Sequence, residues 1–304
     1  KGCLASPISC LIVGSYGSNF VVPRQMSVKP KGKVQAYGEL AAFFRKSEPF
    51  LLQAECLNNL FWEVVRKFRE KGRTTWSGNV FEGGKICLSS LITPSGYLLL
   101  SHCRGDALPR LAAYGRKKNW KLKGVTGPSE SVLPFRRCWM GGEDELVSER
   151  SEFTIYGAAC RRSAPGSGIF RLKAVEPESW PRVESWAVQF ARESVPPLNS
   201  TVLLAMTKEM MLRKNLFFLD KEGVGPCAMG GFGRSTPNSL VINEVFVPRR
   251  LRRKGYGGEL IQGLLGEDAL ELAHRNGSEL KLALSCPHGH DSIDDCIGCT
   301  SRPA

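Results

Sequence analysis

The pattern of hydrophobic and polar positions is most regular between residues 240 and 265. Residues 241–247 read Val-Ile-Asn-Glu-Val-Phe-Val, an alternation that predicts a buried strand. A basic turn at 249–258 ends in Gly-Tyr-Gly-Gly, and Glu-Leu-Ile-Gln-Gly-Leu-Leu at 259–265 has the apolar spacing of an amphipathic helix. The segment is therefore predicted to run from a strand through a glycine-rich turn into a helix.

Similar patterns predict strands and helices in both halves of the chain. In the second half, a strand at 168–174 precedes a helical region with Trp180, Trp186 and Phe190, and a hairpin turns at 220–225. The first half shows two short strands around a Pro-Ser-Gly turn at 87–101, a helix at 106–115, a strand and turn at 122–129, a helix with Phe135 and Trp139, and a strand at 153–156.

The glycine-rich turn has the makings of an anion site. Glycines let the backbone turn with its N–H groups exposed, and the first turn of a helix adds unpaired N–H donors and a positive dipole end. A phosphate or pyrophosphate would suit such a cradle. The spacing excludes two common nucleotide motifs: Lys254 precedes the glycines with no Ser or Thr behind them, and Gly255, Gly257 and Gly258 are followed by Glu259, Leu260 and Ile261.

The turn does resemble the coenzyme A loop of the GNAT acyltransferase superfamily, Arg/Gln-x-x-Gly-x-Gly/Ala, matched by Arg252-x-x-Gly255-x-Gly257 after a strand. The order of the surrounding elements is similar to a GNAT domain over roughly residues 168–277. The first half resembles a degenerate GNAT copy that has no such loop. The resemblance implies an α/β fold with mixed sheets in two tandem GNAT-like domains, at 36–165 and 166–304, the latter with an atypical C-terminal tail.

The resemblance also implies which residues meet the coenzyme. The backbone of 245–247 would pair with the pantetheine, and the turn would hold the pyrophosphate with help from the side chains of Arg252 and Arg253. Tyr256 is interpreted as a packing residue of the turn rather than a proton donor. The full set of expected coenzyme contacts is Val245, Phe246, Val247, Arg252, Arg253, Lys254, Gly255, Tyr256, Gly257 and Gly258.

In GNAT chemistry the acyl group passes directly from acetyl-CoA to an amine. Glu244 is the carboxylate best placed by the sequence to act as general base, and the alternative is that it is a solvent-facing strand residue. The general acid of the family is commonly a Tyr in the last helix, and that position falls on Asp294 here. Coenzyme binding is therefore better supported by the sequence than turnover.

The amino-acid composition restricts the class of protein further. The chain has 304 residues, 42% of them hydrophobic, which is enough for two globular domains. No apolar run approaches the ~20 residues of a membrane helix. The net charge of +13 invites a nucleic-acid interpretation, but the one dense basic cluster lies at the proposed phosphate loop, which favours the coenzyme. Eleven cysteines, most of them singly placed in apolar segments, favour reduced thiols.

The two chain ends leave alternatives open. Residues 1–35 are acid-poor, contain serines and are left out of the predicted fold; they suggest either a transit segment for an organelle or a fragment with a mis-set start, and otherwise the protein is expected to be cytoplasmic. At the other end, Cys286, His288 or His290, Cys296 and Cys299 could supply four zinc ligands. The same residues also fit a degenerate GNAT tail or an unstructured terminus, and no metal site is assigned.

Three hypotheses for function follow. The first is a tandem GNAT N-acyltransferase using acetyl-CoA and an amine of a small molecule, peptide or protein. The second is a catalytically silent module that binds or senses coenzyme A, suggested by the missing Tyr. The third is a basic, zinc-dependent interaction protein built on the C-terminal cysteines.

Overall fold

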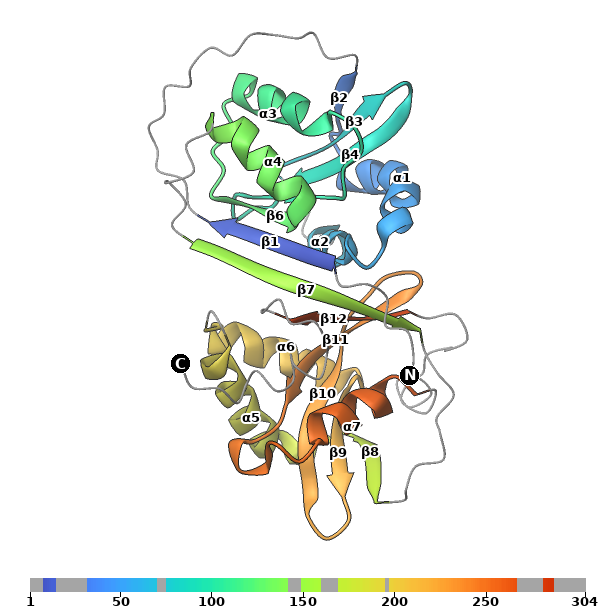
Figure 1. The fold of residues 1–304 in the computed structure, drawn as a ribbon, viewed down its shortest axis with the longest axis vertical. Coiled ribbons are helices and arrows are strands. Elements are labelled where there is room, and N and C mark those ends of the chain that lie inside the picture. Colours follow the sequence, from blue (N-terminus) through green and yellow to red (C-terminus); the bar gives the residue numbers. More distant parts are fainter. Residues whose placement is uncertain are drawn as a thin grey trace. The chain divides into compact units, whose positions relative to one another are not determined.

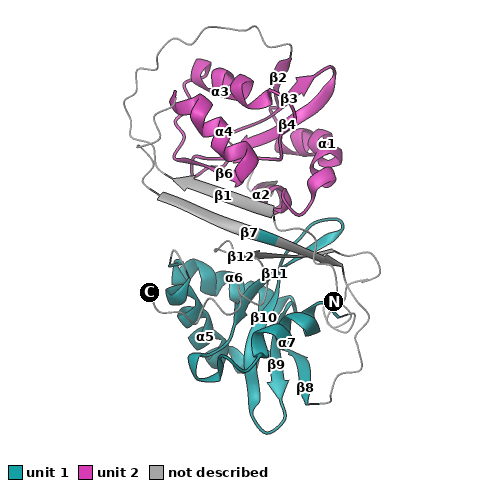
Figure 2. Ribbon diagram, viewed as in Figure 1, with its two compact units in different colours: residues 1–7, 154–304 teal, residues 8–153 magenta. Residues whose placement is uncertain are grey.

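The structure is a computed structural model, and it describes residues 8–14, 32–69, 75–141, 149–159, 169–194, 197–266 and 281–286 (Figure 1). Side chains are described in these ranges except at 8–14, 69, 149–154, 156–159 and 281–286. The chain divides into two compact units (Figure 2). The N-terminal unit is Ile8–Phe153, and the C-terminal unit is Thr154–Ala304 together with Lys1–Pro7.

The C-terminal unit is a mixed sheet with helices on both faces. Its strands lie in the order β7-β12-β11-β10-β9-β8, and all neighbours are antiparallel except β11 and β12, which are parallel. The elements are β7 Glu149–Ala159, β8 Phe170–Ala174, η3 Pro177–Ser179, α5 Trp180–Glu193, α6 Ser200–Leu212, β9 Leu216–Lys221, β10 Gly225–Ser235, β11 Ser239–Phe246, η4 Arg249–Leu251, α7 Tyr256–Leu264 and β12 Lys281–Cys286.

The N-terminal unit repeats this plan. Its strand order is β2-β3-β4-β5-β6-β1, again antiparallel throughout except for one parallel pair, β5 and β6. The elements are β1 Ile8–Gly14, β2 Lys33–Ala36, α1 Leu40–Leu51, η1 Leu52–Ala54, α2 Asn59–Arg69, β3 Trp76–Glu82, β4 Lys85–Ile92, β5 Tyr97–Leu100, α3 Ala107–Lys117, β6 Gly124–Pro128 and α4 Ser129–Met140.

The repeated topology confirms the predicted fold class, an α/β fold with mixed sheets in two tandem copies. In each unit two helices follow the first strand of an antiparallel series of four, and one helix leads from the fourth strand to a parallel fifth. In each unit the sixth strand comes from earlier in the chain than the first. The helix pair α5–α6, the hairpin between β9 and β10, the strand β11 and the helix α7 all lie where the sequence predicts them.

Alternating side chains of β9 show how the C-terminal unit builds its core. Phe217 belongs to the cluster that packs under α7 with Leu260 and Leu264, whereas the next residue, Phe218, packs against Trp186 of α5 at a ring-centroid distance of 5.4 Å. This alternation follows from the two-residue period of a strand. The sheet is therefore covered by α7 on one face and by α5 and α6 on the other (Figure 1).

The structure corrects the prediction at residues 1–35. Ile8–Gly14 form β1, paired antiparallel with β6, and Lys33–Ala36 form β2, paired with β3. The sequence of β1, Ile-Ser-Cys-Leu-Ile-Val-Gly, is rich in the β-branched and apolar residues that suit a strand, which the acid-poor composition of the region obscures. The strand predicted at 153–156 lies within β7, whose residues Thr154–Ala159 pair with β12 of the C-terminal unit. The boundary predicted at 165/166 differs from the division between Phe153 and Thr154.

Candidate functional site

The turn between β11 and α7 contains a run of backbone N–H groups without a partner among the described residues. Arg253 and Gly255 have left-handed backbones, with φ of 59° and 79°, and Gly255 is the N-cap of α7. In the part of the chain that the structure describes, the N–H groups of residues 253–258 donate to no acceptor. The residues that begin a helix leave such donors unpaired, and here the left-handed turn adds more. The arrangement is suited to an anion.

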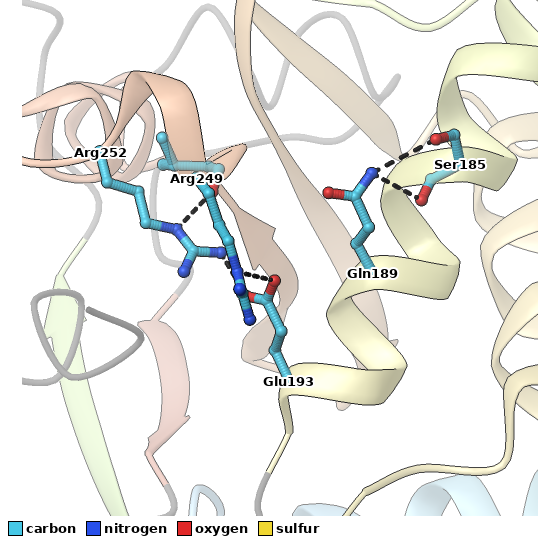
Figure 3. A network of polar contacts seen from close by, with 6 residues as sticks. Ser185, Gln189, Glu193, Arg249 and Arg252 are labelled. Atoms are coloured by element: carbon cyan, nitrogen blue, oxygen red, sulfur yellow. Dashed lines mark hydrogen bonds and ion pairs between the residues drawn. The ribbon is translucent and has the colours of Figure 1, made fainter. Parts of the chain in front are cut away.

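Two arginines of the turn are braced against α5 through one carboxylate (Figure 3). Arg249 donates from Nε to Oε1 of Glu193 over 2.9 Å, and Arg252 donates from Nη2 to Oε2 of the same residue. Arg252 also donates from Nε to the carbonyl oxygen of Val247 over 2.8 Å, and its guanidinium lies 5.7 Å from the centre of the Phe246 ring. The side chain of Arg252 is 10% exposed, so it serves to hold the turn, and its contribution to coenzyme binding stays a prediction.

The remaining basic residues of the turn point to solvent. Arg250, Arg253 and Lys254 are exposed, and the side chain of Arg249 is 77% exposed despite its ion pair. Exposed cations around unpaired N–H donors would attract a phosphorylated ligand from solution. The phosphate contacts expected of Arg253 and Lys254 stay a prediction.

The parallel strands β11 and β12, beside the turn, stop pairing before β11 ends. The ladder between β11 and β12 runs from Ser239↔Lys281 to Ile242↔Leu284 and then stops, although β11 continues to Phe246. The next residues of β12, Ser285 and Cys286, pair with β7. The edge of β11 from residue 243 onward therefore has no ladder partner on the β12 side among the described strands, and an extended ligand could add there as a strand.

The side chains near this open edge are turned into the core. Phe246 is 3% exposed and packs against Trp186, with ring centroids 6.0 Å apart, while Val245 and Val247 contact the cluster under α7. Val245 and Val247 are only partly buried, and the pairing of the 245–247 backbone with pantetheine stays a prediction. Tyr256 is also a core residue, 5% exposed and 5.9 Å from the ring of Phe170, in line with its interpretation as a packing residue.

Glu244 lies at a bulge in β11, directly beside the open edge. On the β10 side, Gly231 pairs with Asn243 and Met229 pairs with Phe246, so β11 contains one residue more than its partner between these pairs. Glu244 takes a left-handed backbone, with φ of 57°, which is rare for a residue with a side chain. Strain of this kind persists where the surroundings enforce it, and it is concentrated at functional sites.

The carboxyl group of Glu244 is buried. The residue is 6% exposed, so the interpretation as a solvent-facing strand residue is wrong. Thr207 of α6 donates its hydroxyl to Oε2 over 2.7 Å, and Oε1 has no hydrogen-bond partner in the described part of the chain. Burial raises the pKa of Glu244 to about 7, against the opposing effect of the Thr207 hydrogen bond. A carboxylate with this pKa can accept a proton near neutral pH.

Among its described residues, the N-terminal unit differs from this site in two respects. A Cβ on Gly127 of β6 would lie 2.4 Å from the carbonyl oxygen of Leu100 at the end of β5, so these parallel strands are in close contact where β11 and β12 part. The helix that follows, α3, has the carboxylate residue Asp106 at its N-cap instead of a glycine. Asp106 makes no side-chain cap hydrogen bond, but its negative charge near the helix N-terminus disfavours a second anion there. The lack of a coenzyme loop in the first half stays a prediction.

The other candidate residues, at the C-terminal end and among the cysteines, give no support for a metal site or a thiol site. Asp294, His288, His290, Cys296 and Cys299 lie outside the described residues, and Cys286 is described only by its place in β12. Within the described ranges, no cluster of three or more His, Cys, Asp or Glu could hold a metal, and no helix is long and apolar enough to cross a bilayer. Cys87, Cys103, Cys138 and Cys227 are free thiols, and burial raises the pKa of Cys103 and Cys227 to about 11, which argues against thiolate chemistry at these two residues.

Comparison with known proteins gives structural matches alone. No family model matches the chain, and no curated protein matches it. The structure is similar to a GNAT-family acetyltransferase from Colwellia psychrerythraea, with 13% identity, 88% of this chain and 94% of the other covered, and a TM-score of 0.47. A GCN5-related N-acetyltransferase from Sphaerobacter thermophilus matches with 13% identity, 79% and 81% coverage and a TM-score of 0.43.

A tandem GNAT protein from the clavulanic acid biosynthesis pathway also matches, with 13% identity, 73% of this chain and 78% of the other covered, and a TM-score of 0.38. At these identities and TM-scores the matches carry no conclusion about activity. The strand order and directions of the two units show a mixed α/β fold in two tandem copies.

Two residues of the site escape the sequence patterns. Glu193, which braces the turn, lies at the end of α5, and Thr207, which contacts Glu244, lies inside α6. Each is far from its partner in sequence, at separations of 59 and 37 residues, so no local spacing indicates it.

Proposed function

We propose that the chain is an acyl-CoA-dependent N-acyltransferase that transfers an acetyl group from acetyl-CoA to an amine, with one coenzyme site per chain. The observation that carries the proposal is the close succession, along one strand and turn, of a buried proton acceptor, an open strand edge and a row of unpaired N–H donors. A base, a site for an extended chain and a site for phosphates are the parts that such a transfer needs.

The coenzyme would bind in two ways. Its pyrophosphate would accept hydrogen bonds from the N–H groups of 253–258, with the exposed side chains of Arg253 and Lys254 adding charge. Its pantetheine amides would pair with the free edge of β11 near Val245. Since Gly255 has a left-handed backbone and open space around its Cβ position, a bulky side chain there would occupy the volume intended for the phosphates.

The chemistry would begin with a proton transfer. Glu244 takes a proton from the substrate ammonium, and the neutral amine then attacks the carbonyl carbon of the thioester. The C–S bond breaks with its electron pair on sulfur, the positively charged nitrogen of the adduct gives up its second proton, and the thiolate takes up a proton. Asp294, at the position of the family's usual Tyr, is the candidate acid from the sequence and lies outside the described residues.

One observation favours a second function. Asp294 replaces the Tyr expected at that position, so the same site could bind coenzyme A without transferring its acyl group. Such a protein would be a binding or sensing module. Coenzyme binding is common to both functions, and turnover separates them.

The experiment that tests the proposal measures the release of free coenzyme A thiol from acetyl-CoA with a broad panel of amines. The wild type should release thiol in a saturable, amine-dependent way. Glu244→Gln should lose turnover and keep coenzyme binding, whereas Gly255→Glu should lose both. Tight coenzyme binding with no thiol release from any amine would overturn acyl transfer and select the binding module.

A further inference from the structure

Thr207 is a buried hydroxyl with two acceptors. It is 0% exposed in the middle of α6, and its Oγ1 lies 2.9 Å from the carbonyl oxygen of Leu203 and 2.7 Å from Oε2 of Glu244. A threonine hydroxyl has one hydrogen, so it can serve only one of these acceptors at a time. Which one it serves depends on the charge of Glu244.

The carboxylate is the stronger acceptor. Leu203 and Thr207 are four residues apart within α6, so the Leu203 carbonyl oxygen receives the backbone N–H of Thr207 and does not require the hydroxyl as well. A hydrogen bond to an ionised group is roughly twice as strong as one between neutral groups. The hydroxyl hydrogen therefore points to Glu244 when the carboxylate is ionised, and it is free to turn to Leu203 once the carboxyl group is neutral.

This contact makes the two oxygens of Glu244 different. Oε2 is held by Thr207, whereas Oε1 is buried and has no partner among the described residues. The left-handed backbone of Glu244, at the bulge of β11, limits the directions in which the side chain can leave the strand. A carboxylate fixed at one oxygen presents the other in a defined direction.

We propose that Thr207 is the positioning residue of the acyl-transfer site: it holds Oε2 of Glu244 in the ionised state and leaves Oε1 as the oxygen that accepts the substrate's proton. This inference rests on the proposed function. In the step concerned, the N–H bond of the ammonium breaks, the O–H bond at Oε1 forms, and the nitrogen keeps the electron pair with which it attacks.

Nearby charges do not account for the shifted protonation equilibrium of Glu244. Burial and the Thr207 hydrogen bond are the causes of its shifted pKa, and no charged neighbour contributes. The ionisable side chains on the elements around it are Arg182, Glu184, Arg192 and Glu193 on α5, Lys208 and Glu209 on α6, Cys227 and Arg234 on β10, and Tyr256 and Glu259 on α7. Thr207 is therefore the side chain whose removal should change the protonation of Glu244 most directly.

The test replaces the hydroxyl and reads the proton directly. The carboxyl carbon resonance of Glu244, assigned by its absence in Glu244→Gln, is followed through a pH titration in protein labelled at glutamate. Thr207→Val keeps the shape and removes the donor, so the midpoint should rise by about 1 to 2 pH units, the size expected for a hydrogen bond to a charged group. Thr207→Ser should restore the wild-type midpoint, and Thr207→Ala gives the same reading if the valine variant does not fold.

A matched control lies in the other unit. Ser47 of α1 also donates a buried hydroxyl to the carbonyl oxygen four residues earlier, Phe43, over 2.8 Å, and it contacts Asn79 of β3 over 3.0 Å. Ser47→Ala removes a comparable buried hydroxyl and should leave the Glu244 midpoint unchanged. The acid limb of the kcat/KM profile should move with the midpoint in Thr207→Val and stay in place in Ser47→Ala.

The outcomes separate the two proposals. A folded Thr207→Val or Thr207→Ala protein whose Glu244 midpoint is unchanged would overturn the role of Thr207, whatever its activity. A midpoint that rises while kcat falls equally at every pH would overturn it too, because the residue would then be only structural for the reaction. If the midpoint rises and the wild type acylates no amine, the hydrogen bond stands, while the proposed function and the catalytic use of Oε1 are both refuted.

Discussion

Replacing Glu193 by glutamine removes the charge through which α5 holds the turn before α7. Glu193 is 15% exposed at its side chain and meets Arg252, which is 10% exposed, and Arg249, which is 77% exposed (Figure 3). Glutamine keeps the size and one acceptor oxygen but cannot neutralise the Arg252 guanidinium. Arg252 would keep its contact with Val247 and would meet a neutral amide on α5 in place of a carboxylate.

The size of the effect follows from the exposure of each pair. Hydrogen bonds to charged groups contribute ~1.5–3 kcal/mol, and the retained acceptor of glutamine lowers the loss at Arg252 to about 1–2 kcal/mol. The exposed contact with Arg249 should add less than ~1 kcal/mol. The turn must be ordered for its N–H groups to converge on a phosphate, so part of the lost free energy should appear as weaker coenzyme binding. The expected loss of affinity is roughly 5- to 30-fold at most.

The assay is urea unfolding combined with calorimetric titration of coenzyme A. Glu209→Gln is the matched control, because Glu209 on α6 pairs with Arg213 and both side chains are about half exposed, at 46% and 53%. The control should cost less than ~0.5 kcal/mol and leave affinity unchanged. If Glu193→Gln behaves like Glu209→Gln in both measurements, the bracing role assigned to Glu193 is refuted.

Three further predictions concern Glu244, Gly255 and the N-terminal unit. The pKa of Glu244 is raised to about 7 from 4.5 for a free carboxyl, so the folded protein should lose up to ~3 kcal/mol of stability as pH rises from 4.5 through about 7. Glu244→Gln should lack this loss, so its free energy of unfolding in urea should exceed that of the wild type above neutral pH but not at acid pH. Parallel pH dependences of the two proteins would contradict the burial of the carboxyl group. Gly255→Ala and Gly223→Ala introduce the same backbone strain, at φ of 79° and 74°, and both Cβ positions have open space, so each should cost ~1–2 kcal/mol of stability. Only Gly255→Ala should also weaken coenzyme binding. Equal affinities of the two variants for the coenzyme would place the ligand elsewhere. Titration should find one coenzyme per chain, because β5 and β6 stay in contact at Gly127; a second site would refute the difference between the units.

The parts of the site that depend on local sequence could be predicted. The alternation of β11, the glycines of the turn and the apolar face of α7 each follow from a fixed spacing, and the structure has them in place. The left-handed backbone of Glu244 could not be predicted, because glutamate rarely adopts it and the bulge depends on the register with β10. Arg252 illustrates the same limit: its type is part of the motif, but its contact with Glu193 depends on how α5 packs beside the turn.

The fold in two copies shows the same limit of sequence-based prediction at the level of whole strands. The tandem arrangement could be predicted from the resemblance of both halves to GNAT domains. The place of the sixth strand in each sheet could not, because β1 and β7 come from segments that precede the rest of their sheets in the chain. An acid-poor composition at 1–35 obscured a strand that is defined by its pairing with β6.

The proposed function depends on coenzyme A binding at the turn between β11 and α7. Isothermal titration calorimetry of acetyl-CoA into the wild type and into Gly255→Glu measures this binding, with free coenzyme A and a longer acyl-CoA as companions. We expect saturable binding of one acetyl-CoA per wild-type chain and no binding to a folded Gly255→Glu protein. Binding that is absent in the wild type, or equally strong in the variant, would refute the assignment of the turn.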